Sequence, residues 1–200
     1  MKKWAVAVAI LSVSGVAVAA APSTHGEIPG VVGINHVGFT VPNEAQAVKF
    51  FHEVLGCEKA YEFGPFEDKK GDLMKKMLNV NPRAVIDHLT MMRCGEGSNI
   101  EIFQYTAPDQ KTTYPLNSDM GGFHIAFYVK NEDAAVKKAR ELGLRVLEGP
   151  VPIKTGPAAG QTVNYVIAPW GQQLELISYP KGMAYEHDTK VRLWAPQAGY

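Results

Sequence analysis

The chain has 200 residues, of which 46% are hydrophobic, and its 20 basic and 20 acidic residues give a formal net charge of zero at pH 7. That apolar content can build a substantial core, and the length allows one domain or two small ones. The balanced charge gives no excess of basic residues to indicate nucleic-acid binding. We therefore expect a globular protein whose partner is a small molecule and not a nucleic acid.

Residues 1–21 have the pattern of a secretory signal peptide. Lys2 and Lys3 precede an uncharged apolar run from Trp4 to about Val18, and small residues of the A-x-A type follow, ending near Ala21. The run is too short and too rich in alanine to favour a spanning helix, so we expect no membrane association after cleavage. The leader holds two of the 20 basic residues and none of the acidic ones, which leaves a mature charge of −2. We expect a periplasmic or secreted protein.

The remainder of the chain contains an internal repeat. INHVGFTVPNEAQAVKFFHEVLG (34–56) matches FHIAFYVKNEDAAVKKARELG (123–143) at an offset of 88 residues, which aligns His36 with His124. Each segment is typical of a strand that leads into a helix, with a capping asparagine, Asn43 or Asn131, at the helix start.

A second match lies further along each half. GSNIEIFQY (97–105) aligns with GQQLELISY (171–179) at an offset of 74 residues, so Glu101 falls on Glu175 and Tyr105 on Tyr179. Both segments are typical of strands that carry one carboxylate inside an apolar run. The two offsets differ by 14 residues, which predicts an insertion in the first half, and the charged, helix-like segment 66–82 between two prolines fits it.

These patterns predict an α+β protein built from two β-α-β-β-β modules. The loop 148–161, which carries Lys154, is either a plain connector or a lid over the substrate. We place the first module at 33–105, with the insertion near 66–82, and the second module at 121–180. A polar linker at 106–120 joins them, and an unmatched tail follows at 181–200. Further strands are expected near 57–63, 84–94, 144–148 and 161–168.

The repeat supplies one histidine and one glutamate from each module. A lone histidine on an apolar strand is usually a hydrogen-bonded core residue, and a lone acid can face solvent, but the repetition of both favours metal binding. If the halves pack pseudo-symmetrically, the four side chains can converge on one divalent ion, Zn²⁺, Ni²⁺, Co²⁺, Mn²⁺ or Fe²⁺, with positions left for water or substrate. The candidate ligands are His36, Glu101, His124 and Glu175. His88 has no counterpart in the second half and is left out.

The segments INHVGFTV, NIEIFQY, GFHIAFYV and APWGQQLELISY, in this order, resemble the ligand-bearing strands of the vicinal oxygen chelate superfamily over about residues 33–180. That superfamily includes glyoxalase I, methylmalonyl-CoA epimerase, extradiol dioxygenases, and fosfomycin and bleomycin resistance proteins. The resemblance implies that the two tandem βαβββ modules form a pseudo-symmetric open barrel around a metal site. It also implies one metal ion that chelates two oxygens of a small carbonyl substrate. Members are often homodimers, in some of which the site is shared between chains, and the sequence does not choose an arrangement.

The number of ligands favours one activity of the superfamily over others. Extradiol dioxygenases use two histidines and one glutamate on iron, whereas glyoxalases and epimerases usually have a fourth ligand at the position of Glu101. A glutamate there can remove a proton beside a carbonyl, so the resemblance favours a lyase or isomerase with Glu101 or Glu175 as the base. The alternatives are an Fe(II)-dependent extradiol-type dioxygenase and a non-catalytic drug- or metabolite-binding protein of the bleomycin-resistance type. Thr40 and Tyr105 replace the arginine and asparagine of small bacterial glyoxalase I, which argues against glutathione as substrate.

The two cysteines, Cys57 and Cys94, fall at the ends of neighbouring expected strands. A disulfide between them is geometrically feasible, although their spacing does not show that they pair. We predict no catalytic role for either.

Overall fold

The computed structural model describes residues 28–196, and the predicted signal peptide lies outside the described residues. The compact unit that begins at Ile34 contains all of the helices and strands described below. No helix in the described part of the chain is long and apolar enough to cross a membrane.

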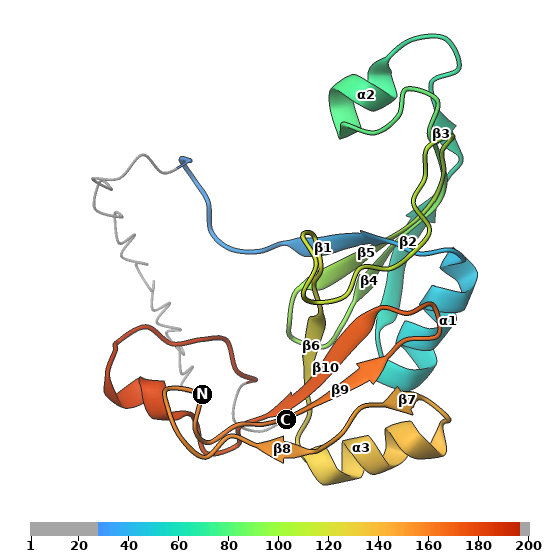
Figure 1. The fold of residues 1–200 in the computed structure, drawn as a ribbon. Coiled ribbons are helices and arrows are strands. Elements are labelled where there is room, and N and C mark those ends of the chain that lie inside the picture. The colour runs from blue at the N-terminus through green and yellow to red at the C-terminus, as the bar shows by residue number, and fades with distance from the viewer. Residues whose placement is uncertain (1–27, 197–200) are drawn as a thin grey trace, which may run out of the picture. The chain divides into compact units, whose positions relative to one another are not determined.

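The first module is a five-stranded sheet with a helix on one face (Figure 1). Four strands lie in the order β1 (His36–Thr40), β5 (Asn99–Thr106), β4 (Val85–Arg93) and β2 (Glu58–Phe63), and β3 (Phe66–Glu67) pairs with β4. Strand β1 is parallel to β5, and the other pairs are antiparallel. Helix α1 (Glu44–Leu55) connects β1 to β2, and the short helix α2 (Leu73–Leu78) follows β3.

The second module repeats this topology. Its strands lie in the order β6 (Ile125–Tyr128), β10 (Gln173–Ser178), β9 (Thr162–Ile167) and β7 (Arg145–Val146), and β8 (Val151–Pro152) pairs with β9. Helix α3 (Glu132–Glu141) connects β6 to β7, and the 3-10 helix η1 (Ala184–His187) lies in the tail. The predicted α+β fold of two βαβββ modules is confirmed.

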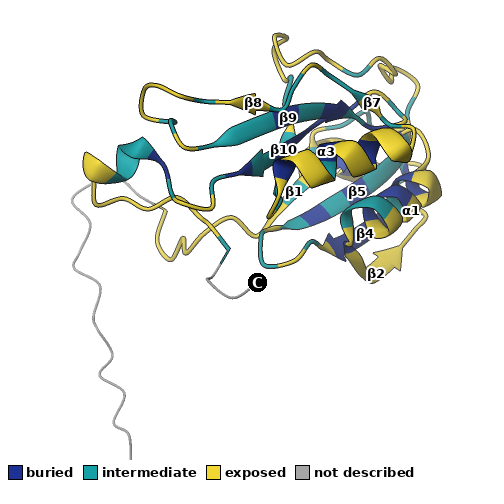
Figure 2. Cartoon of the chain, turned by 90° about the horizontal axis from the view of Figure 1, so that it is seen from below, coloured by how far each residue is buried: buried dark blue, intermediate teal, exposed yellow. Residues whose placement is uncertain are grey.

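The expected caps start both long helices. Asn43 Oδ1 accepts a hydrogen bond from the amide of Gln46 (2.8 Å), and Asn131 Oδ1 accepts one from Ala134 (3.0 Å). Each bond satisfies a backbone N–H that has no partner within the helix. Both helices bury one face and expose the other (Figure 2). The caps therefore fix where each helix starts, and the apolar stripe fixes which side faces the sheet.

The insertion in the first half folds into the segment that contains α2. Met74 of α2 is fully buried in a small apolar cluster with Leu89, against which Phe103 and Tyr105 pack. The predicted insertion is thus an ordered cap on one end of the first sheet.

The two modules share one hydrophobic core. Phe51 of α1 packs against Phe127 of β6, with ring centroids 6.2 Å apart, and Phe50 contacts Trp170 of the second module at 5.4 Å. Tyr114, from the linker, donates a hydrogen bond to the carbonyl of Thr40 (2.8 Å), and burial raises its pKa to about 12. Because the helix-bearing side of each sheet faces this common core, the opposite side of each sheet, here called its open face, is turned away from it.

A disulfide joins Cys57, immediately before β2, to Cys94, immediately after β4. The two strands are hydrogen-bonded neighbours, and Glu58 lies opposite Arg93, so the bridge closes the end of the ladder. Cys57 is fully buried in the shared core, on the helix side of the sheet.

Candidate active site

The predicted ligands form one histidine–glutamate pair in each module. His36 Nε2 lies 3.3 Å from Glu101 Oε2, and His124 Nε2 lies 2.9 Å from Glu175 Oε2. His36 starts β1 and His124 directly precedes β6, and each glutamate lies on the last strand of its module, which is the parallel neighbour of the first. In both modules the first strand therefore lies beside the last.

Both pairs lie on open faces. Ile100 and Ile102 are buried in the shared core, so Glu101 between them points to the other side of β5. The same alternation directs Glu175 away from the core. The side chains of His36 and His124 remain 38% and 34% exposed, which leaves both imidazoles accessible to a ligand.

One chain does not bring the four residues to a single point. Among residues 28–196, no three His, Cys, Asp or Glu side chains lie close enough together to hold one metal ion. The structure thus forms two pairs on faces that turn away from the same core. The assignment of all four residues to one ion stays a prediction, as does the barrel around it.

An asparagine contacts the second ring nitrogen of each histidine. Asn35 Oδ1 lies 2.8 Å from His36 Nδ1, and Asn117 Nδ2 lies 3.1 Å from His124 Nδ1. An oxygen acceptor at Nδ1 places the proton there and leaves the Nε2 lone pair for a metal, and rotation of the Asn117 amide presents its oxygen in the same way. The donor set therefore fits a divalent ion. Sequence reasoning missed both asparagines, although Asn35 adjoins His36; Asn117, in the linker, gave no local signal.

The absence of a side chain at Gly38 leaves space beside the first pair. A Cβ atom at this position would lie 3.3 Å from Glu101 Oε2 and 3.3 Å from Cε2 of Phe103. Gly38 lies directly across from Glu101, and Ala126 occupies the matching place across from Glu175. The first module thus gives its carboxylate more room than the second.

Negative charge is costly around Glu175. Burial, together with the charges of Glu175 and Asp133, raises the pKa of Glu132 to about 7. Burial and the charge of Glu175 also raise the pKa of Tyr165, whose ring meets that of His124 edge-on at 5.4 Å. A cation at the His124–Glu175 pair would relieve this excess of negative potential.

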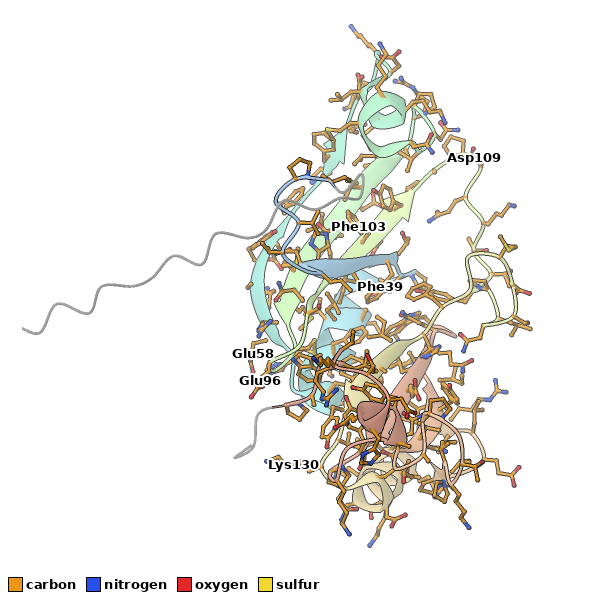
Figure 3. All side chains as sticks on the ribbon, turned by 90° about the vertical axis from the view of Figure 1, so that its left-hand side faces the viewer. Phe39, Glu58, Glu96, Phe103, Asp109 and Lys130 are labelled. Carbon is orange, nitrogen blue, oxygen red and sulfur yellow. A yellow bond between two sulfur atoms is a disulfide. The ribbon has the colours of Figure 1, made fainter. Side chains whose placement is uncertain are left out.

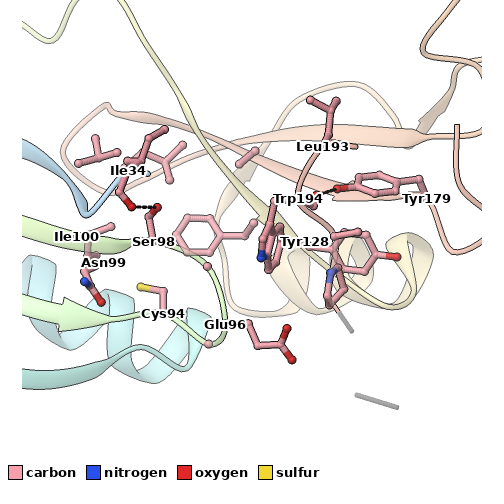
Figure 4. A pocket seen from close by; sticks show the side chains of 18 of the residues that line it. Ile34, Cys94, Glu96, Ser98, Asn99, Ile100, Tyr128, Tyr179, Leu193 and Trp194 are labelled. Carbon is pink, nitrogen blue, oxygen red and sulfur yellow. Dashed lines mark hydrogen bonds between the residues drawn. The ribbon is translucent and has the colours of Figure 1, made fainter. Parts of the chain in front are cut away.

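A pocket lies between the two modules and the tail (Figure 4). Its walls come from the connection between β4 and β5, from β6, and from residues 192–196. Tyr179 donates a hydrogen bond from its hydroxyl to the carbonyl of Trp194 (2.6 Å), which holds the tail along this pocket. Of the four predicted ligands, His124 is the one that lines it.

Comparison with known proteins identifies the family. Residues 35–165 match the family model described as the Glyoxalase/Bleomycin resistance protein/Dioxygenase superfamily. The chain belongs to this superfamily. The fold is also that of a glyoxalase family protein from Bacillus cereus, with a TM-score of 0.57 at 16% identity over 74% of this chain and 94% of that one.

A curated relative is more similar in sequence. The 2-epi-5-epi-valiolone epimerase of an Actinomyces species is 45% identical over 174 residues, which cover 86% of this chain and 93% of the relative.

Proposed function

We propose that this protein is an exported, metal-dependent epimerase that moves a proton at the carbon beside the carbonyl of a small hydroxylated ketone. The observation that carries the proposal is the repetition of a His–Glu pair on the open face of both modules. The 45% identity to an epimerase supports isomerase chemistry over ring-cleaving oxygenation and over binding without reaction.

His36, Glu101, His124 and Glu175 would hold the metal ion. Two imidazole nitrogens and two carboxylate oxygens suit Zn²⁺, Ni²⁺, Co²⁺, Mn²⁺ or Fe²⁺, and they leave coordination positions for substrate oxygens. When bound, the ion polarises the substrate carbonyl and makes the adjacent C–H bond more acidic.

The site is completed in a homodimer. Because both open faces turn away from the core of their own chain, the first module of one chain can meet the second module of its partner. Such a contact brings His36 and Glu101 of one chain opposite the His124–Glu175 pair of a second copy of the chain. A closed two-chain arrangement creates two equivalent sites.

The two carboxylates suit a proton transfer that inverts a stereocentre. Inversion requires the proton to leave one face of the carbon and a proton to return to the other face. Glu101 and Glu175 belong to different modules, so in the shared site they flank the substrate from two sides. A carboxylate that had left the ion would remove the proton, and the other, off the ion and protonated, would deliver one, with no net change in atoms.

Export is supported by the disulfide as well as by the leader sequence. The bond between Cys57 and Cys94 needs an oxidising compartment to persist, and the periplasm provides one.

Metal analysis and proton exchange test the proposal. The mature protein, purified without chelators, is expected to hold about one divalent ion per chain, and to exchange the proton beside the carbonyl of 2-epi-5-epi-valiolone in D₂O, seen by ¹H NMR. His124→Ala should lose both properties, and His88→Ala, which alters an exposed histidine outside the set, should keep both. A wild-type protein without metal after reconstitution, or oxygen uptake with catechols and no proton exchange, would overturn the proposal.

Mixing two inactive variants tests whether the site is shared. His36→Ala and His124→Ala each remove a ligand from every site, but a mixed dimer contains one site with both histidines. Random mixing is therefore expected to restore about a quarter of the wild-type activity. No recovery, with exchange of subunits demonstrated, would show that each site lies within a single chain.

A further inference from the structure

The two modules differ in the surroundings of a tyrosine that the repeat places near the end of each last strand. Tyr179 of the second module has its hydroxyl bonded to the carbonyl of Trp194, and its ring meets Tyr128 edge-on at 4.9 Å. Tyr105 of the first module stacks on Phe103, with centroids 5.3 Å apart and planes 26° apart. None of the hydrogen bonds among the described residues comes from the Tyr105 hydroxyl, so that group is available to a ligand.

Tyr105 and Phe103 stand on the same open face as Glu101. The three residues alternate along β5 with Ile102, which is buried in the shared core. Burial and the charge of Glu101 raise the pKa of Tyr105, so its hydroxyl remains a hydrogen-bond donor at neutral pH. Along the face that holds the His36–Glu101 pair, the Phe103 ring therefore follows two residues after Glu101 and the Tyr105 hydroxyl two residues after that.

The insertion packs beside this aromatic pair on the same face of the sheet. The cluster around Met74 of α2 includes Leu89, which lies directly across from Phe103 in the sheet. Phe103 lies between β1 and the segment that carries α2 (Figure 3). The second module has no such segment, and at the place of Phe103 it has Ile177. The first module thus braces Phe103 and Tyr105 with an inserted segment, whereas the second module has Ile177 and Tyr179 at these places, and its Tyr179 meets Tyr128.

We propose that the substrate lies on the open face of the first module, with its carbon skeleton against Phe103 and with the Tyr105 hydroxyl donating a hydrogen bond to one of its oxygens. The proposal rests on the proposed function and assigns the substrate to one of the two half-sites. A hydroxylated carbon ring suits this surface, since its C–H groups pack on aromatic faces while its hydroxyls take hydrogen bonds from the rim. The second module then contributes its ligand pair, and its tyrosine anchors the tail.

Paired substitutions at repeat-related positions test this assignment. Tyr105→Phe is expected to lower kcat/KM for proton exchange of 2-epi-5-epi-valiolone about tenfold, the effect of one lost hydrogen bond. Tyr179→Phe, which removes the matching hydroxyl, should leave kcat/KM within about twofold of wild type. Both variants should keep the wild-type metal content, which separates substrate binding from damage to the site.

A second pair of variants tests the role of the Phe103 ring. Phe103→Ile gives the first module the residue of the second, and it is expected to raise KM about tenfold with kcat little changed. Ile177→Val, a conservative change on the other open face, should leave KM unaltered. Calorimetric titration of the metal-loaded proteins with 2-epi-5-epi-valiolone should show the same order of affinities.

The outcomes separate this inference from the proposed function. Proton exchange by the wild-type protein, with unchanged kinetics in Tyr105→Phe and Phe103→Ile, would overturn the assignment and leave the epimerase intact. A loss of activity in Tyr179→Phe as large as that in Tyr105→Phe would also overturn it. Absence of exchange in the wild-type protein would overturn both.

Discussion

Glu44 and Glu132 occupy equivalent positions in the first turns of α1 and α3, but only Glu44 receives a side-chain hydrogen bond. The hydroxyl of Thr90 donates to Glu44 Oε1. Both carboxylate oxygens of Glu132 are buried and have no hydrogen-bond partner among the described residues. Asn164 takes the place of Thr90 in the second module, but its amide donates to the carbonyls of Leu147 and Glu148. The second module therefore begins its helix with a buried carboxylate to which no group in the described part of the chain donates a hydrogen bond.

Glu132 should make the protein less stable as the pH rises. Its pKa is raised from the ordinary 4.5 to about 7 in the folded protein, so between these values the unfolded chain has released a proton that the folded chain still holds. The free energy of unfolding should fall across that window and level off above pH 7. Glu132→Gln should remove this contribution and stabilise the protein above pH 7 by about 1 to 2 kcal/mol. Urea denaturation at a series of pH values measures it.

A change that removes the hydrogen-bond donor of Glu44 in the first module provides the control. Thr90→Val leaves the buried carboxylate of Glu44 without its donor, and it should destabilise the protein by about 1 to 3 kcal/mol at pH 7. If Glu132→Gln is as destabilising as Thr90→Val at that pH, the carboxylate of Glu132 has a partner in solution.

The disulfide should contribute substantially to stability and little to the site. The bridge joins residues 37 apart in sequence, and constraint of a loop of that length is worth about 3 to 4 kcal/mol. The Cys57→Ala/Cys94→Ala protein should unfold at a lower urea concentration yet bind metal as the wild type does, since Cys57 is buried on the helix side of the sheet. Dithiothreitol should shift the wild-type curve toward that of the variant and leave the variant's curve in place.

A larger residue at Gly38 should weaken metal binding. Because a Cβ there already lies 3.3 Å from Glu101 Oε2, the branched side chain of Gly38→Val must displace the carboxylate or the ring of Phe103. We expect a loss of about 10- to 100-fold in metal affinity, measured by competition with a chromophoric chelator. Ala126→Gly, at the matching place, should change affinity little; an equal loss there would show that space at Gly38 is not the cause.

Asn117 of the linker should strengthen metal binding by His124. Without Asn117, the Nδ1 atom of His124 loses its partner at 3.1 Å, so the imidazole is free to turn away from Glu175. Asn117→Ala is expected to lower metal affinity about tenfold. Asp109→Ala, which alters an exposed residue of the same linker, should have no effect, and equal affinities in the two proteins would remove the role assigned to Asn117.

Much of the fold could be predicted because its signals lie close together in sequence and occur in both halves of the chain. Capping asparagines, apolar stripes and alternating strands depend on residues close in sequence, and strands expected near 57–63 and 84–94 run at 58–63 and 85–93. The two-residue strands β3 and β8 were not predicted, since their pairing with long strands creates them and they have no pattern of their own. The repeat also predicted that each module supplies one histidine and one glutamate.

The packing between modules could not be predicted. It depends on contacts such as those of Phe50 and Phe51 with Trp170, which join segments over 100 residues apart and have no counterpart in the repeat. That packing decides whether the two open faces meet or diverge. The sequence therefore predicted the four candidate ligands but not that they form two separate pairs in one chain. The asparagine behind His124 was hidden for the same reason, because it comes from a linker without periodicity.

The outward direction of the two open faces has a consequence for any assay of this protein in dilute solution. Under the proposed two-chain site, a single chain holds two half-sites and no complete one, so the number of working sites follows the concentration of dimer. Specific activity and bound metal should then fall together when the protein is diluted below its dimer dissociation constant, and recover together on concentration. A turnover number is therefore meaningful only when quoted with the protein concentration at which it was measured.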